Sequence, residues 1–171
     1  MSDDSTLLNA DIETGRALKR SGDEIGAIRH FEALAGRYPD HPRVIAELAY
    51  AYDFAGREEQ ALAPYRRALE LGLPDDLLPG HLLGLGSTLR NVGQVEESVG
   101  VLRDAVARFP ARADLKIFLA LSLHSAGEPT AALVTLLDLV LASPGVELHG
   151  YERAARYYTD ELAGRLDPQE T

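Results

Sequence analysis

Hydrophobic positions along the chain recur every three or four residues, in segments that end at a glycine and resume after a short polar stretch. This period is typical of amphipathic helices with one buried face. The glycines that separate the segments are Gly22, Gly56, Gly93 and Gly127. Glycine ends a helix readily because it adopts the left-handed backbone conformation at little cost. The pattern therefore predicts four helix pairs, each turning at its glycine.

The residues around these glycines are in register, which indicates one repeated unit. Successive glycines are 34, 37 and 34 residues apart, and three extra residues in the linker PDDLLPG account for the longer step. Seven residues before each glycine stands a small residue, in order Gly15, Ala49, Gly86 and Ala120. Nine residues after it stands a bulky residue, in order Phe31, Tyr65, Leu102 and Leu136. Small residues let two helices approach and bulky residues fill the groove between them, so the register predicts antiparallel pairs.

This register resembles the tetratricopeptide repeat (TPR) family. The resemblance is best over residues 43–74, where LAYAYDFAGREEQALAPYRRALELGLP fits nearly throughout. It implies an all-α fold, a right-handed α-solenoid of four TPR-like antiparallel helix pairs plus a C-terminal capping helix. Within residues 5–146 the expected units are 8–41, 42–75, 79–112 and 113–146, and the capping helix is expected at 147–166. The polar ends, 1–4 and 167–171, are expected to fray.

Two further segments, GLGSTLRNVGQVEESVGVL and FLALSLHSAGEPTAAL, are similar to the repeats of small stand-alone bacterial TPR proteins without an assigned function. That resemblance implies a bacterial protein and names no ligand. Among the 17 basic residues only Lys19 and Lys116 are lysines, a skew that agrees with a GC-rich bacterial genome.

The charge and composition narrow the classes of partner. A net charge of −10 argues against nucleic acids and anionic membranes, because both attract clustered Lys and Arg side chains. The absence of cysteine excludes disulfides and thiolate chemistry. The first residues, MSDDSTLL, lack the features of a signal peptide, and the longest apolar run, 131–142, contains Asp138 and is too short for a bilayer. A cytoplasmic protein is expected.

Candidate catalytic or metal-binding residues are sparse. The five histidines show no spacing typical of a metal site, and His81, at a predicted helix start, is interpreted as a surface residue. The acidic pairs Glu58-Glu59 and Glu96-Glu97 also lie at helix starts, where carboxylates favour the positive end of the helix dipole. The sequence therefore predicts no enzyme, no cofactor and no metal site.

A partner-binding surface is expected on the first helices of the four pairs, which line the concave side of such a stack. Residues ten, six and three positions before each glycine share one face of a helix, and the residue two positions before it flanks that face. The candidate groove residues chosen from these positions are Arg16, Lys19, Arg20, Tyr50, Asp53, Phe54, Ser87, Arg90, Asn91 and His124. Their mixture of cations and aromatic rings would suit a peptide or partner protein with apolar anchors and an acidic group.

Some TPR domains clasp a C-terminal carboxylate, but the positions required for that clamp hold Ile12, Arg16, Glu47, Gly80 and Gly84 here, so the clamp is not expected. The alternative function is a self-associating scaffold, such as a homodimer formed through the groove or through the helix that contains Tyr151, Tyr157 and Tyr158. A secretion-type chaperone is a further alternative, by analogy of size, charge and fold alone.

Overall fold

Nine α-helices and no β-strand make up the part of the chain that the structure, a computed structural model, describes: residues 2–166, with side chains from residue 6. The helices are α1 (Ser2–Arg20), α2 (Glu24–Arg37), α3 (Pro42–Phe54), α4 (Glu58–Glu70), α5 (Leu78–Asn91), α6 (Val95–Arg108), α7 (Ala113–Ser125), α8 (Pro129–Ala142) and α9 (Glu152–Leu162). Residues 2–4, which were expected to fray, belong to α1. The predicted frayed ends at 1 and 167–171 lie outside the described residues.

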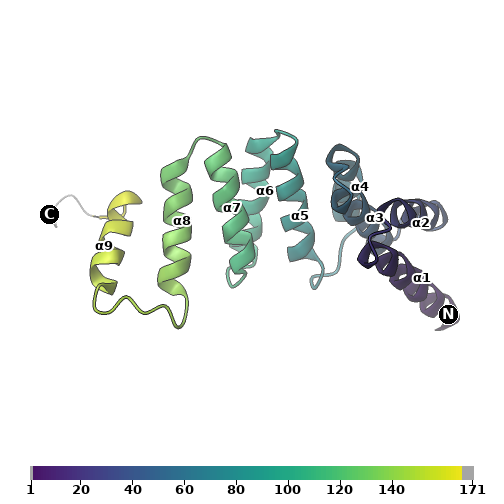
Figure 1. Cartoon of the computed structure of the whole chain (residues 1–171), viewed down its shortest axis with the longest axis horizontal. Helices are drawn as coiled ribbons and strands as arrows, with labels where there is room; N and C mark the ends of the chain where they lie inside the picture. The colour runs from purple at the N-terminus through teal and green to yellow at the C-terminus, as the bar shows by residue number, and fades with distance from the viewer. Residues whose placement is uncertain (1, 167–171) are drawn as a thin grey trace.

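The first eight helices form four antiparallel pairs that follow one another along the molecule (Figure 1). Each odd-numbered helix packs against its even-numbered partner, and α1, α3, α5 and α7 also pack against one another in sequence. This is the all-α stack of antiparallel helix pairs that the resemblance implies. The helices α5–α8 stand side by side in Figure 1, whereas α1–α3 are turned relative to them. The inner helices α5 and α7 also contact each other more extensively than α1 and α3 or α3 and α5 do.

The predicted turns are confirmed at all four glycines. Gly22, Gly56, Gly93 and Gly127 have φ angles of 82°, 66°, 82° and 78°, the left-handed region that an L side chain avoids. The residue after each glycine donates its N–H back to the first helix of the pair, for example from Gln94 to the Leu89 carbonyl at 2.8 Å. This bond satisfies a carbonyl that the end of the helix would otherwise leave unpaired.

The small and bulky positions pack as the register predicts in the first three pairs, whereas the bulky residue of the fourth, Leu136, is 39% exposed. Phe31, Tyr65 and Leu102 are at most 1% exposed. Phe31 and Leu102 lie against Gly15 and Gly86 of their own pairs, and Tyr65 also reaches Gly84 of the next pair. Gly86 lies so close to Leu102 that a Cβ atom on residue 86 would be 2.5 Å from Leu102 Cγ. The small residue is therefore required by the approach of the two helices, and no turn is involved at this position.

A matched pair of substitutions tests this close approach. We expect Gly86→Ala to lower the free energy of unfolding by about 1–3 kcal/mol, because the added methyl group overpacks the core against Leu102. Gly100→Ala, in a helix interior where nothing lies within 4 Å of the new Cβ, should raise it by about 0.5–1 kcal/mol. Urea denaturation of both variants measures the effect, and two changes of the same sign would contradict the packing described.

The C-terminal helix α9 is shorter than the predicted 147–166. Its start is delayed because His149 and Gly150 both have positive φ angles, and Gly164, with φ of 65°, follows its end. The helix packs along α8, and its backbone does not approach α7. Arg165, beyond its end, donates to the Asp138 carboxylate of α8 at 2.5 and 3.0 Å.

Candidate functional site

The inner face of α1, α3 and α5 carries a connected set of polar side chains. Arg16 of α1 donates to Glu47 of α3 from Nε at 2.9 Å and from Nη2 at 2.5 Å, and to Glu13 from Nη1 at 2.7 Å. The Glu47 side chain is 5% exposed, so this ion pair bridges two repeats largely away from solvent. The hydrogen bond to Glu47 raises the pKa of Arg16 above its usual range.

Lys19 lies one turn further along the same face. Its Nζ atom is 5.6 Å from the centre of the Tyr50 ring, within the range of a cation–π interaction. Lys19 forms no ion pair with any residue from 6 to 166, and burial lowers the pKa of its amine. A half-buried cation without a carboxylate partner attracts an anion more strongly than a cation that is fully solvated.

Tyr50, His81 and Tyr65 form a compact cluster beneath this surface. The Tyr50 hydroxyl is 3.0 Å from His81 Nδ1, and His81 Nε2 is 2.9 Å from the Tyr65 backbone oxygen. Because a carbonyl only accepts, Nε2 must donate, and in the neutral ring Nδ1 then accepts from the Tyr50 hydroxyl. The Tyr65 hydroxyl donates to Asp53 at 2.8 Å. Burial raises the pKa of both tyrosines, so they remain protonated donors.

The interpretation of His81 as a surface residue is wrong, because its side chain is fully buried. It stands twelve residues before Gly93, and the equivalent residues in the neighbouring pairs are the buried Val44 and Leu115. The repeat register carried this signal, since it marks residue 81 as a core position. His81 does lie in the first turn of α5, which begins at Leu78, so a place near a helix start did not imply exposure here.

The burial of His81 has a consequence for stability. Desolvation lowers the pKa of this imidazole, against a smaller opposite effect of its hydrogen bond to Tyr65. Below a pH of about 6.5 the unfolded chain therefore takes up a proton that the folded chain does not. We expect the urea midpoint to fall as the pH is lowered through this range, and to fall less in His81→Gln, which keeps a donor and an acceptor. If the urea midpoint changed equally with pH in the wild type and in His81→Gln, the pH dependence would not come from His81.

The remaining predicted groove residues do not all lie on one surface. Arg20 and Phe54 are exposed, and Ser87 and Arg90 are half-buried on the inner helix α5. Arg90 Nε is buried without a hydrogen bond to a described residue, and Arg90 forms no ion pair with one. His124 lies apart from the polar set, in an apolar hollow of about 310 Å³ between α7 and α8.

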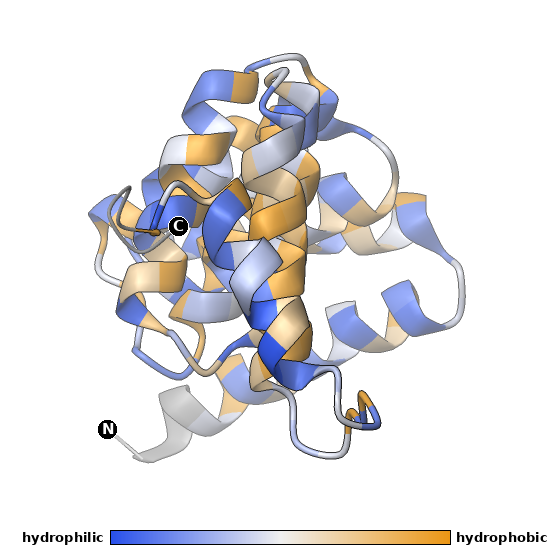
Figure 2. Ribbon diagram, turned by 90° about the vertical axis from the view of Figure 1, so that its left-hand side faces the viewer, coloured by the Kyte–Doolittle hydropathy of each residue, from blue (hydrophilic) through white to orange (hydrophobic). Residues whose placement is uncertain are grey.

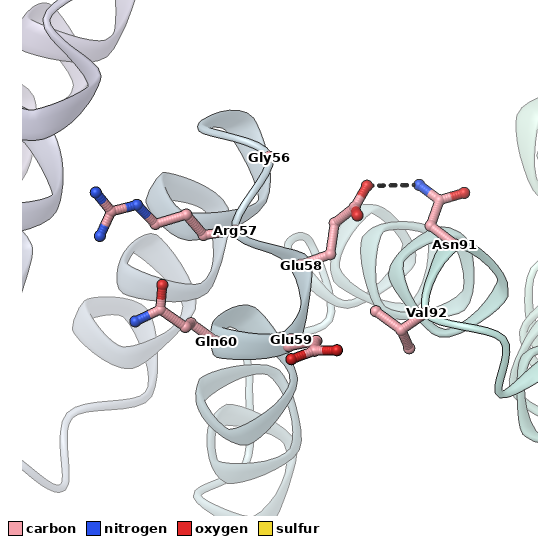
Figure 3. A pocket seen from close by; sticks show the side chains of 7 residues that line it. All are labelled: Gly56, Arg57, Glu58, Glu59, Gln60, Asn91 and Val92. Carbon is pink, nitrogen blue, oxygen red and sulfur yellow. Dashed lines mark hydrogen bonds between the residues drawn. The ribbon is translucent and has the colours of Figure 1, made fainter.

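Asn91 belongs to a different surface. It lines a hollow of about 380 Å³ between the α3–α4 turn and the end of α5, together with Gly56, Arg57, Glu58, Glu59, Gln60 and Val92 (Figure 3). Asn91 Nδ2 donates to Glu58 at 2.9 Å, and Figure 3 shows Arg57 and Gln60 directed away from this bond. The asparagine therefore joins two neighbouring repeats, a role that its predicted place in the groove did not include.

Glu47 and Tyr65 complete the polar set and were not among the predicted site residues. Glu47 is a carboxylate between the apolar Ala46 and Leu48, and Arg16 precedes it by 31 residues, close to one repeat length. A charged residue inside an apolar segment, with an opposite charge one repeat away, is the signal that could have identified the pair. Tyr65 was predicted only as a bulky core residue.

Among the side chains described, from residue 6 to residue 166, no group of three or more His, Cys, Asp or Glu residues is placed to hold a metal ion. No helix in this range has the length and hydrophobicity needed to cross a membrane.

Several solved structures have a fold similar to this stack of helix pairs. MamA from Desulfovibrio magneticus RS-1 aligns with a TM-score of 0.67 and 18% identity, over 92% of this chain and 90% of that one. Another MamA crystal structure aligns with a TM-score of 0.68 and 21% identity, over 88% of this chain and 85% of that one. An O-GlcNAc transferase from Thermobaculum terrenum aligns with a TM-score of 0.70 and 24% identity, over 82% of this chain and 27% of that one. These similarities concern the fold.

The comparison with curated protein sequences finds no match. A family model described as Tetratrico peptide repeat matches residues 42–162, which is more than half of the chain. The match begins at the first residue of α3 and ends at the last residue of α9. The repeated turns, the packing register and this match together show that the chain belongs to the tetratricopeptide repeat family.

Proposed function

We propose that this protein is a non-catalytic binding module that holds an acidic segment of a partner protein against the inner face of α1, α3 and α5. Membership of the TPR family supports a protein-interaction scaffold. The observation that carries the finer proposal is the pair of cations Lys19 and Arg90, which occupy equivalent positions of α1 and α5 and form no ion pair with a described residue.

The surroundings of these cations favour an acidic ligand. Arg16 is already bound to Glu47 and Glu13, whereas Lys19 and Arg90 form no ion pair with a described residue. Arg90 donates from Nη2 to the uncharged side chain of Asn91 at 3.0 Å, and its buried Nε has no described partner. The exposed ring of Phe54, on the intervening inner helix α3, could contact an apolar side chain of the same ligand. In a protein with a net charge of −10, a local surface with two unpaired cations would direct an acidic segment to this site.

The test uses defined peptides. A random peptide library is selected against the immobilised protein, and fluorescence anisotropy then measures the affinity of the selected peptides. We expect the peptides to contain Asp or Glu, and we expect Lys19→Met/Arg90→Met to bind them about tenfold or more weakly, the loss of one charge-assisted contact. Replacing the acidic residues of the peptide by their amides should weaken binding to the wild type to a similar degree.

The matched control is Arg29→Met/Arg103→Met, which removes two exposed cations from the outward helices α2 and α6. This control has the same net charge as the groove variant, so it separates a local effect from a general electrostatic one. Selected peptides without acidic residues, or equal affinities of the two double variants, would refute the proposed ligand class.

A further inference from the structure

The helix α8 is apolar on two sides, and α9 covers only one of them. Val134 lies on the outward side and is buried in the presence of α9, whereas its equivalents Arg29, Ala63 and Gly100 are exposed. Figure 2 shows the molecule from this end, with the hydrophobic colouring concentrated along an upright helix in the centre of the view. The predicted capping helix therefore shields a side of α8 that the other pairs leave to solvent.

A second side of α8, which carries Leu133 and Leu136, remains uncovered by α9. Leu136 is 39% exposed, whereas the equivalent residues Phe31, Tyr65 and Leu102 are 0%, 1% and 0% exposed. Leu133 is 47% exposed, and its equivalents in order are Ile28 at 3%, Leu62 at 7% and Val99 at 5%. With Ile117 and Leu121 of α7, these two leucines line the hollow of about 310 Å³. We call this surface the C-terminal seat.

The interior of the stack shows what normally covers such a surface. Ile28 and Phe31 of the first pair pack in one cluster with Val44 and Ala51 of α3, the first helix of the next pair. Val44 and Ala51 stand twelve and five residues before their glycine. At this first interface, the residues that fill the seat therefore come from the inner helix of the next pair and include these two positions.

At the other end of the stack, the first helix α1 carries the same two positions, and no described helix covers them there. Ala10 and Ala17 of α1 stand twelve and five residues before Gly22, and both are exposed. Their equivalents in α3, α5 and α7 are at most 2% exposed: Val44, His81 and Leu115 for the first position, and Ala51, Thr88 and Ser122 for the second. Leu7 and Thr14 lie on the same side of α1 and are exposed as well. We call this surface the α1 face.

We propose that the α1 face of a second copy occupies the C-terminal seat, so that copies of this protein join head to tail and continue the stack. The interaction repeats the contact between consecutive pairs inside one copy. Neither surface has the neighbouring helix that covers the equivalent residues of the other pairs. The α1 face carries the two positions that, in α3, pack on the surface equivalent to the C-terminal seat. The proposal does not depend on the ligand of the inner face, because it uses neither Lys19 nor Arg90.

This geometry has two consequences for assembly. The two surfaces differ, so the contact is heterologous and leaves one seat and one α1 face available at the ends of every oligomer. Assembly should therefore proceed beyond the dimer as concentration rises. Each copy carries a net charge of −10, so repulsion between copies opposes the contact, and added salt should strengthen it.

Two variants that each block one surface provide the test. Leu133→Glu places a carboxylate in the C-terminal seat, and Ala17→Glu places one on the α1 face. Sedimentation velocity should show concentration-dependent oligomers for the wild type and monomers for each variant alone. Mixed together, the variants should form a 1:1 dimer and nothing larger, because the mixture offers one intact seat and one intact α1 face per pair.

The control is Ile25→Glu, which adds an acid at an exposed apolar residue whose equivalents Glu59 and Glu96 are already acidic. This variant should assemble like the wild type. Circular dichroism must show the same helix content in all variants, because the substituted residues are exposed. A wild type that stays monomeric from micromolar to millimolar concentration at high salt would overturn the proposal. Self-association of either single blocked variant, or a mixture that stays monomeric, would do the same.

Discussion

Replacement of Tyr65 by alanine should lower the free energy of unfolding by about 3–5 kcal/mol, as expected for a large buried aromatic side chain. Tyr65 is 1% exposed and contacts the rings of Tyr50 and His81, with ring centres 5.8 and 4.9 Å away. Its removal leaves a cavity between the second and third pairs. A loss of this size is a large part of the stability of a typical domain, about 5–15 kcal/mol.

Tyr65→Phe separates the cavity from the hydroxyl. This variant keeps the ring and removes only the hydrogen bond to Asp53, so it should cost about 0.5–1.5 kcal/mol. Urea denaturation followed by circular dichroism measures both variants. If Tyr65→Ala cost no more than Tyr65→Phe, the ring would not be a core element, and the assignment of its position in the repeat would fail.

The second large effect is expected at the ion pair between Arg16 and Glu47. Arg16→Met should lower the free energy of unfolding by about 2–3 kcal/mol, because it leaves the buried Glu47 carboxylate without its partner. The loss should be smaller than that of a fully buried pair, since the Arg16 side chain is 29% exposed. The Glu47 Oε2 atom is buried without a hydrogen bond to a described residue, so no second donor compensates.

Two further variants complete this test. Arg16→Met/Glu47→Met removes both charges and should recover stability to within about 1 kcal/mol of the wild type. Arg37→Met breaks the more exposed pair with Asp11, at 2.7 Å, and should cost no more than about 1 kcal/mol. Equal losses for Arg16→Met and Arg37→Met would show that the bridge between α1 and α3 has no special role in stability.

The sequence predicted the helix pairs well because their determinants are local and repeated. A glycine turn depends on the backbone preference of one residue, as at Gly93, and the apolar period depends on neighbours within one helix. Four copies in register then identified the small and bulky positions, such as Gly86 and Leu102, because chance agreement at every copy is improbable. The candidate site was predicted less well, since its polar contacts join residues of different repeats.

The sequence by itself therefore determined the repeat, its turns and the residues that pack inside each pair. Only the tertiary structure decided that His81 bonds to Tyr50 and Tyr65, that Glu47 pairs with Arg16, and that α9 packs against the side of α8 that contains Val134. Local periodicity cannot select a side of a helix that is apolar nearly all round, such as α8. That choice follows from the path of residues 143–151 and from contacts between distant parts of the chain, and it leaves Leu133 and Leu136 exposed at the end of the stack.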